Sequence, residues 1–415
     1  MKKSELYPRL VEPRLVEALA DTPVVLVHGP RQCGKTTLAQ LVGEKHGYRY
    51  FSFDDSALLS AARADPTGFV DDLPELAILD EVQRVPEIFI SLKRTIDRRR
   101  RPGRFLLTGS SNILLLPTLS DSLAGRMEIL RLHPLSQCEL AMQKPIFLNR
   151  LFSASFGTNQ YERLHRELTG KVVAGGYPAA LSRGTVRRRS SWYRDYIQTL
   201  IQRDVRDISR IHQLDALPRL LSLAAENSAQ LFNVTHLSAP FQARRMTIRS
   251  YITLLEQIFL LELLPPWHSN RVRRLIKTPK LHMGDTGLAC AMMGVGTDAL
   301  KDDRSLFGHL VETFVYQEVK RQASGHEETF RFYHFRDKDK MEVDMVIELG
   351  ARKIAGIEVK SGATVRSKDF RGLRKLQSGT GNRFACGVVL YDGETSVRFG
   401  DNLFALPIRT LWETM

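Results

Sequence analysis

The chain has 415 residues, a length typical of about two to four domains rather than one. Hydrophobic residues make up 43% of it and charged residues 26%, a balance that supports globular cores and excludes wholesale disorder. Lys and Arg number 60 against 46 for Asp and Glu, so the formal net charge is +14. This excess favours a polyanionic partner, with nucleic acid ahead of a membrane surface.

No stretch approaches the ~18 consecutive apolar residues that a membrane helix needs, and residues 1–20 lack the apolar centre of a signal peptide. We therefore expect a soluble, cytoplasmic protein with no membrane partner. Four cysteines, Cys33, Cys138, Cys290 and Cys386, lie far apart and form no CxxC pair. This spacing supports neither a disulfide framework nor a zinc ribbon, and buried free thiols are expected.

The pattern of apolar runs predicts an α/β protein with four regions. Between residues 23 and 148, short apolar runs alternate with helix-like segments, which favours a mostly parallel sheet. Residues 149–210 are predicted to be helical, with an interruption at Gly175, Gly176 and Pro178. Residues 214–288 suggest helices followed by a β-ribbon. From residue 306 a helix and several strands suggest a second, smaller α/β unit.

A phosphate-binding motif of the form GxxxxGK[ST] follows the first apolar run, residues 24–27, and a helical segment follows the motif. Backbone N–H groups at such a strand-to-helix turn can wrap the phosphates of a nucleotide. In this motif the lysine reaches the β and γ oxygens and the hydroxyl ligates Mg²⁺. The predicted nucleotide-binding residues are Gly29, Pro30, Arg31, Gln32, Cys33, Gly34, Lys35, Thr36 and Thr37.

Two further strand ends carry candidate catalytic groups. The apolar run at residues 76–79 ends in Asp80 and Glu81. Asp80 would hold the Mg²⁺ shell and Glu81 would polarise the attacking water. A third strand, residues 104–108, leads to Asn112, whose amide can lie beside the γ-phosphate. Arg126 follows a flexible glycine, and a surface salt bridge is its alternative role.

Together these residues resemble the AAA+ family of P-loop ATPases. The resemblance implies that Lys35 and Thr36 form the phosphate-binding motif, that Asp80 and Glu81 form the second motif, and that Asn112 is the polar sensor. Arg126 is then the candidate arginine finger or phosphate sensor. The order GPRQxGKTTL, LDE, TGSSN, SLAGR, GGYP is similar to bacterial and archaeal AAA+ ATPases that carry a C-terminal domain of unknown function. ATP is expected rather than GTP, because no guanine-selecting NKxD motif is present.

The middle of the chain resembles a winged helix. Thr247 can cap a helix that places Ile248, Tyr251, Leu254, Leu255 and Ile258 on one face, and the following segments can form a β-ribbon. Basic residues suited to phosphates are Arg244, Arg245, Arg249, Arg271, Arg273, Arg274 and Lys277. A winged helix that only packs against protein is the open alternative. Residues 98–101, four consecutive arginines, are a second candidate for phosphate contact, and a solvated helix end is the alternative for them.

The C-terminal region predicts a hairpin with two carboxylates opposite each other. If residues 350–352 form the loop, Leu349 faces Lys353, and Asp344 then lies opposite Glu358. Direct cross-strand neighbours lie about 5 Å apart, so a cation between these carboxylates would relieve their repulsion. Strand periodicity places Lys360 on the same face. Two carboxylates on Mg²⁺ beside a lysine suit metal-assisted phosphodiester cleavage.

This Asp…Glu-x-Lys pattern resembles the PD-(D/E)xK nuclease family, although Val343 stands where the family's nominal proline would be. The resemblance implies metal ligands at Asp344, Glu358 and Glu312, with Lys360 acting in catalysis. Two alternatives stay open: an exposed Lys–Glu ladder, and a nuclease-like fold that holds DNA without cutting it.

We therefore expect an AAA+ core at residues 1–148, a helical lid or linker at 149–213, a winged-helix-like region at 214–290 and a nuclease-like domain at 300–415. The expected function is ATP- and Mg²⁺-dependent action on DNA, with ATPase activity and an undecided nuclease activity. The alternatives are a nucleotide-switched DNA-binding regulator and an adaptor for a protein partner. A homo-oligomer is compatible with each of them.

Overall fold

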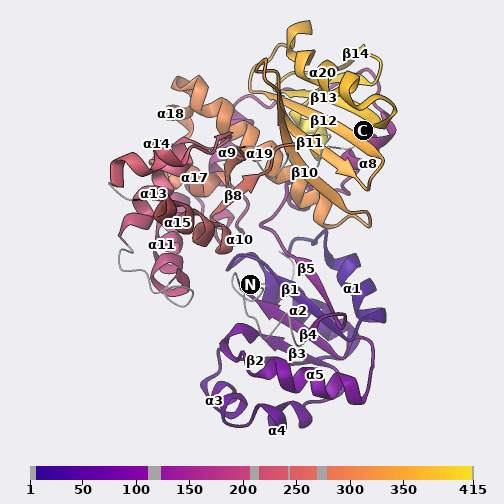
Figure 1. Cartoon of the computed structure of the whole chain (residues 1–415), viewed down its shortest axis with the longest axis vertical. Coiled ribbons are helices and arrows are strands. Elements are labelled where there is room, and N and C mark those ends of the chain that lie inside the picture. The colour runs from indigo at the N-terminus through magenta and orange to yellow at the C-terminus, as the bar shows by residue number, and fades with distance from the viewer. Residues whose placement is uncertain (1–5, 111–122, 206–214, 242–243, 269–277, 414–415) are drawn as a thin grey trace. The chain divides into compact units, whose positions relative to one another are not determined.

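The computed structural model describes residues 6–110, 123–205, 215–241, 244–268 and 278–413. By internal contacts the chain divides into two compact units. The first consists of residues 1–135 with 257–259 and 324–327, and the second consists of the rest. Each unit is shown in Figure 1 and is described by itself below.

The first unit alternates helices and strands, as its pattern of apolar runs predicts. Its elements are α1 (Glu12–Asp21), β1 (Val24–His28), α2 (Lys35–His46), β2 (Arg49–Ser52), α3 (Ser56–Ala64), α4 (Pro66–Asp71), β3 (Ala77–Asp80), α5 (Ile88–Arg98), β4 (Phe105–Gly109) and β5 (Met127–Arg131). The strands form one sheet in the order β2-β3-β4-β1-β5, and every pairing in it is parallel. The predicted parallel sheet is therefore confirmed.

Helices cover both faces of this sheet. Alternate residues of β1 point to opposite sides: Val24 and Leu26 pack with α3, α4 and α5, whereas Val25 and Val27 pack with α1 and α2. All five β1 residues are buried, which explains why the strand has a continuous apolar sequence instead of an alternating one. Because the strands are parallel, their carboxyl ends meet at one edge, and the loops that follow β1, β3 and β4 share that edge.

The second unit contains the helical middle and the C-terminal sheet. Its elements are α7 (Gln137–Leu140), α8 (Phe147–Ser153), β6 (Asn159–Gln160), α9 (Arg166–Ala174), α10 (Pro178–Leu181), α11 (Val186–Leu200), α13 (Ala216–Glu226), β7 (Gln230–Leu231), α14 (Val234–Ser238), α15 (Arg245–Gln257), β8 (Leu261–Leu264), β9 (Lys280–Met283), α17 (Thr286–Met293), α18 (Thr297–Asp302), α19 (Arg304–Ser324), β10 (Phe330–Arg336), β11 (Glu342–Leu349), β12 (Lys353–Lys360), α20 (Arg371–Thr380), β13 (Phe384–Tyr391), β14 (Thr395–Gly400) and β15 (Leu403–Pro407).

In the described residues between α13 and β9, the α-helices are α13, α14 and α15 and the strands are β7, β8 and β9. The strands pair antiparallel in the order β7-β9-β8, so the last strand lies in the middle. In α15, the predicted apolar face is confirmed, since Ile248, Tyr251, Leu254 and Leu255 are buried. The opposite face exposes Arg245, Met246 and Arg249. Arg271, Arg273, Arg274 and Lys277 lie outside the described residues.

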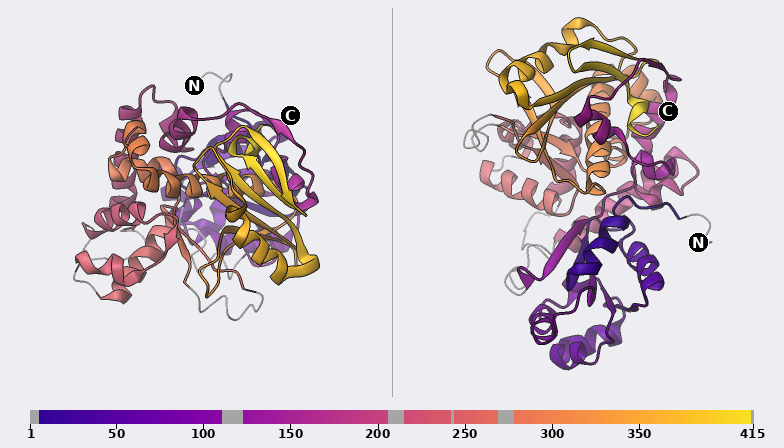
Figure 2. Two further views of the ribbon diagram at one scale, coloured as in Figure 1. Left: turned by 90° about the horizontal axis from the view of Figure 1, so that it is seen from above. Right: turned by 90° about the vertical axis from the view of Figure 1, so that its right-hand side faces the viewer.

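The C-terminal part is built on a seven-stranded sheet in the order β10-β11-β12-β13-β15-β14-β6. Strands β10, β11 and β12 form an antiparallel meander, and β13 then pairs parallel to β12. Helix α20 connects these last two strands and packs against β11, β12 and β13 (Figure 2). Phe370, Leu373 and Leu376 close the apolar core on that side of the sheet.

A buried aspartate, Asp285, links several segments of the helical middle by hydrogen bonds and an ion pair. Asp285 is fully buried and accepts hydrogen bonds from the backbone N–H groups of Gly176 (2.8 Å) and Gly287 (2.9 Å) and from the Tyr193 hydroxyl (3.2 Å). It also pairs with Arg321 of α19 at 2.9 Å. A Cβ on Gly175 would lie 2.1 Å from Asp285 Oδ1, and its φ of +65° also favours glycine. Gly175 of the GGYP segment is thus explained by packing.

Helices of the described residues are all too short or too polar to span a lipid bilayer. The four cysteines are buried and free, as their spacing predicts.

Candidate functional site

The phosphate-binding motif forms the turn between β1 and α2. Gly29 follows β1 directly, the loop continues through Gly34, and Lys35, Thr36 and Thr37 form the first turn of α2. Gly34 has φ +103°, a conformation that favours glycine, and it brings the chain into the helix. The N-terminal N–H groups of α2 therefore face the loop, the arrangement that binds phosphate in proteins.

Lys35 and Thr36 lie where their motif requires them. The Lys35 ammonium is buried and donates to the carbonyls of Gly29 (3.1 Å) and Pro30 (3.0 Å), which hold it over the loop. The Thr36 hydroxyl donates to both carboxylate oxygens of Asp80, at 3.0 and 3.1 Å. A hydroxyl and a carboxylate in direct contact at a phosphate loop have the oxygen chemistry that Mg²⁺ prefers, so these two residues fit a magnesium site.

Two residues that the sequence did not single out also bind Asp80. Tyr50, on β2, donates its hydroxyl to Asp80 Oδ2 at 2.7 Å, and Thr108, near the end of β4, donates to Asp80 Oδ1. Burial and the hydrogen bond to Asp80 raise the pKa of Tyr50, so the phenol stays protonated. Asp80, at the end of β3, is thus fixed by hydrogen bonds from α2, β2 and β4. The only sequence signal for Thr108 was its place as the last residue of the predicted strand at 104–108.

Glu81 lies beside Asp80 in a strained backbone conformation. Its φ of +58° and ψ of +43° are left-handed, which costs a non-glycine residue about 1 kcal/mol or more. Its carboxylate accepts hydrogen bonds from the Gln83 amide and from the Ser110 hydroxyl at 3.4 Å. Gln83 also donates to Ser110 at 2.9 Å. The predicted catalytic base is therefore held by groups that follow β3 and β4.

The edge contains two further groups that the sequence did not reveal. Arg9 donates to the carbonyl of Cys33 at 2.7 Å and to that of His133 at 2.6 Å, so it braces the phosphate loop. Burial, together with Arg131 and Lys35, lowers the pKa of His28 to about 3, so this histidine is neutral at the start of the loop. Asn112, the predicted sensor, lies outside the described residues.

Arg126 lies at the opposite edge of the sheet. It precedes β5 by one residue, and β5 begins opposite the first residue of β1, with Val24 paired to Met127. A five-residue strand spans roughly 16 Å, so Arg126 cannot contact a nucleotide on the phosphate loop of its own chain. The prediction of a phosphate sensor is therefore wrong for Arg126. An arginine finger acting on a second copy of the chain stays a prediction.

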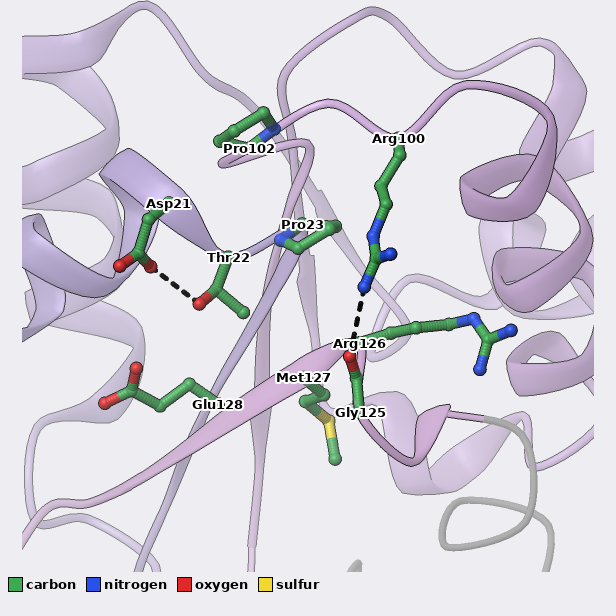
Figure 3. Close-up of a pocket in the computed structure, with 9 residues that line it drawn as sticks. All are labelled: Asp21, Thr22, Pro23, Arg100, Pro102, Gly125, Arg126, Met127 and Glu128. Carbon is green, nitrogen blue, oxygen red and sulfur yellow. Dashed lines mark hydrogen bonds between the residues drawn. The ribbon is translucent and has the colours of Figure 1, made fainter.

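Around Arg126 the first unit has an open pocket of about 610 Å³, and Pro23, Arg100 and Gly125 are among the residues that line it (Figure 3). The Arg126 guanidinium forms a bidentate ion pair with Asp97, with hydrogen bonds of 2.6 and 3.1 Å. The predicted arginine run at residues 98–101 also has protein partners. Arg99 and Arg101 both pair with Glu75, and Arg100 donates to the carbonyl of Gly125. One carboxylate, Glu75, offsets only part of the charge of this run, and phosphate contact by it stays a prediction.

In the second unit, the hairpin register is confirmed. Leu349 pairs with Lys353 and Met345 with Ile357, so the next step places Asp344 opposite Glu358. Asp344 Oδ2 accepts the Val359 N–H at 2.9 Å, which brings its carboxylate onto β12. The Lys360 ammonium donates to Glu358 Oε1 at 2.7 Å. Glu312, from α19, completes the predicted acidic set.

A lysine that the sequence did not implicate lies among these acids. The Lys280 ammonium, on β9, is 2.6 Å from Glu312 Oε1 and 3.1 Å from Asp344 Oδ1. Its side chain is only 5% exposed. Burial opposes its charge, but the carboxylates of Glu312 and Asp344 raise the pKa of Lys280 above its ordinary value. The ammonium thus stays charged between two of the three predicted metal ligands.

Glu312 and Glu358 are largely withdrawn from solvent. Burial, followed by the charge of Asp344, raises the pKa of Glu312 and of Glu358 to about 8. Glu358 Oε2 is buried and has no hydrogen-bond partner within the described ranges. In the same ranges, no three His, Cys, Asp or Glu side chains lie close enough together to hold a metal ion. The donor chemistry suits a cation, but the cation in contact with two of the acids is Lys280.

The parallel sheet in this strand order, the phosphate loop and the acidic end of β3 define an AAA+ P-loop ATPase core, to which a further α/β part is joined. The comparisons agree with this class. Residues 21–141 match the family described as AAA domain. Residues 165–299 and 307–411 match two families described as domains of unknown function, DUF8612 and DUF4143 respectively.

Two relatives match nearly the whole chain, and each is described as an uncharacterized protein. The chain is 29% identical over 397 residues to an uncharacterized protein of Mycobacterium tuberculosis and equally to one of Mycobacterium bovis, covering 95% of this chain and 82% of each relative. Among solved structures, a Walker-type ATPase of Pyrococcus abyssi is similar at 14% identity, with 70% of this chain and 97% of that chain covered and a TM-score of 0.44.

Proposed function

We propose that this ATPase binds DNA through the part between α13 and β9, with ATP binding and hydrolysis governing the interaction. The observation that carries this proposal is the order of elements α13, β7, α14, α15, β8, β9 with β9 between the other two strands. This order of elements supports a winged helix, in which the helix at the position of α15 would enter the major groove.

The exposed face of α15 has the charge that this role requires. Arg244 and Arg245 stand at its start, Arg249 lies one turn further on, and all three are exposed. Met246 between them is 72% exposed, although it is a large apolar residue. Arginines on an exposed helix that is anchored by an apolar face can contact phosphates and base edges. The alternative is that this face binds a protein partner.

For the ATPase reaction, the chain's own residues divide the work. The phosphate loop and Lys35 bind the β and γ phosphates, and Thr36 and Asp80 would hold Mg²⁺, which supplies positive charge to the phosphate oxygens. Glu81 accepts a proton from the attacking water. Tyr50, Thr108 and Gln83 act as positioning residues, because they fix the two carboxylates by hydrogen bonds.

The DNA proposal predicts weaker phosphate binding by an Arg245→Ala, Arg249→Ala double variant. Affinity should fall similarly for all sequences, and the slope of log affinity against log salt should become shallower by about 0.9 for each phosphate that the variant no longer neutralises. Fluorescence anisotropy with duplex DNA between about 50 and 200 mM salt measures this slope. Arg398→Ala is the matched control, since that exposed arginine already pairs with Asp401.

An unchanged slope in the double variant would argue against α15 as the DNA-binding element. Affinity that does not depend on salt at all would instead favour the protein partner.

A second candidate function is metal-dependent cleavage of DNA by the C-terminal part. The specific observation in its favour is that α19 and β11 bring Glu312 and Asp344 to one buried ammonium, that of Lys280, while Glu358 on β12 is bonded to Lys360. The order α19, β10, β11, β12, α20, β13, with β13 parallel to β12, fits the nuclease-like fold that the resemblance implies. Asp344, Glu358 and Glu312 would hold the ion, and Lys360 would orient water or stabilise the phosphate.

For this site we expect Asp344→Ala and Glu358→Ala each to remove divalent-metal binding and any cleavage, because one carboxylate is a poor ligand set. Lys360→Ala should abolish cleavage yet keep metal, since a lysine acts on the phosphate or water. Plasmid nicking and calorimetric Mn²⁺ titration measure the two effects. The ATPase rate is the control and should not change. Metal binding that survives both carboxylate changes would contradict the site.

A further inference from the structure

We propose that Lys280 is a resident counter-cation of the acidic site and that it must leave before a divalent ion can bind there. The inference rests on the second candidate function, since it concerns the same carboxylates. It adds a residue from another sheet that controls whether the site is open to metal.

The distances define what Lys280 occupies. Its ammonium contacts Glu312 Oε1 at 2.6 Å and Asp344 Oδ1 at 3.1 Å, and these two oxygens come from different elements, α19 and β11. A divalent ion binds carboxylate oxygens at about 2.0–2.6 Å. An ion coordinated by the same two oxygens would overlap the ammonium and repel it. Lys280 and a metal therefore exclude each other.

The charges of the site support this exchange. The ammonium of Lys280 contacts Glu312 and Asp344, and the ammonium of Lys360 contacts Glu358. Glu358 Oε2 is buried and has no partner among the residues described. A buried carboxylate oxygen without a partner is costly. A divalent ion in place of Lys280 would give Glu358 Oε2 a partner.

Lys280 lies on a different sheet from Asp344 and Glu358, so its side chain can leave the site while the hairpin that carries these two acids stays in place. Lys280 is the first residue of β9, which pairs with β7 and β8, whereas Asp344 and Glu358 belong to β11 and β12 of the seven-stranded sheet. A shift of β9 relative to that sheet would uncover the acids without altering their hairpin. Lys280 thus links the proposed DNA-binding part to the proposed metal site.

The test is Lys280→Met in the full chain, measured by thermal unfolding in EDTA and in Mn²⁺, together with calorimetric Mn²⁺ titration. In EDTA the variant should melt below the wild type, because two buried carboxylates lose their counter-charge. Mn²⁺ should raise the melting temperature of the variant and leave that of the wild type nearly unchanged. Its Mn²⁺ affinity should exceed that of the wild type at least about tenfold, since a competing cation has been removed. Adding Asp344→Asn should abolish the gain.

A matched control is Lys320→Met, which removes a partly buried lysine that pairs with Glu262 in the same unit. It should lower stability without creating a response to Mn²⁺. If Lys280→Met alone does not fold, the double variant with Glu312→Gln removes one charge of each sign and keeps Asp344 and Glu358. It should then still bind Mn²⁺ more tightly than the wild type.

Two outcomes distinguish failure of the Lys280 inference from failure of the proposed metal site. Wild-type Mn²⁺ binding that equals that of Lys280→Met and needs Asp344 would overturn the role of Lys280 and leave the metal site standing. Folded variants that bind no Mn²⁺ would overturn both. DNA affinity and its salt slope, measured on the same proteins, test the α15 proposal independently of either result.

Discussion

Glu81→Gln leaves ATP bound but lowers its hydrolysis by about 10²–10⁴-fold, the contribution expected of a general base. The amide keeps the shape and the hydrogen bonds that Gln83 and Ser110 make to this side chain, but it cannot accept the proton of the attacking water. Single-turnover hydrolysis of labelled ATP measures the loss, and equilibrium binding of fluorescent ATP measures retention.

Lys35→Ala should weaken ATP binding itself, whereas Glu81→Gln leaves it intact. The β and γ phosphates lose their cation, and a charged hydrogen bond contributes about 1.5–3 kcal/mol, so binding should weaken by roughly 10–100-fold. Lys45→Ala on the same helix is the control, because Lys45 is exposed and pairs with Glu12 at 2.7 Å. Normal turnover by Lys35→Ala with tight nucleotide binding would refute the assignment of the loop.

Asp285→Ala should destabilise the second unit by roughly 3–5 kcal/mol, the usual effect of removing one partner of a buried ion pair. Arg321, itself 6% exposed, would lose the carboxylate to which it is paired at 2.9 Å. The N–H groups of Gly176 and Gly287 would lose their acceptor as well. Chemical unfolding followed by circular dichroism measures the change, with the two units fitted separately because a chain of this size need not unfold in one step.

The control is Asp298→Ala, which removes an exposed aspartate that pairs only across one turn of α18 with Lys301. That change should leave the unfolding curve in place. Asp285→Asn should be milder than Asp285→Ala, because its amide oxygen can still accept from the backbone N–H groups. Equal stability of the Asp285→Ala and Asp298→Ala proteins would show that the buried network does not support the fold.

The sequence by itself determined the features that depend on residues close together in the chain. The phosphate loop needs one strand, one turn and one helix start, so the residues from Gly29 to Thr36 suffice to predict it. The hairpin register follows from a short loop and the strict two-residue period of its strands, which places Asp344 against Glu358. The buried face of α15 follows from helical periodicity in the same way.

Only the tertiary structure decided which groups meet across the fold. The strand order β2-β3-β4 brings Tyr50 and Thr108 to Asp80. Arg126 precedes β5, which runs parallel to β1, so it lies at the end of the sheet opposite the phosphate loop. Lys280 contacts Glu312 and Asp344, which lie 32 and 64 residues further along the chain. These contacts exist only because the fold brings the side chain of this β9 residue to α19 and β11. Local periodicity carries no information about such pairings, since they depend on how separate elements bury their apolar faces against one another.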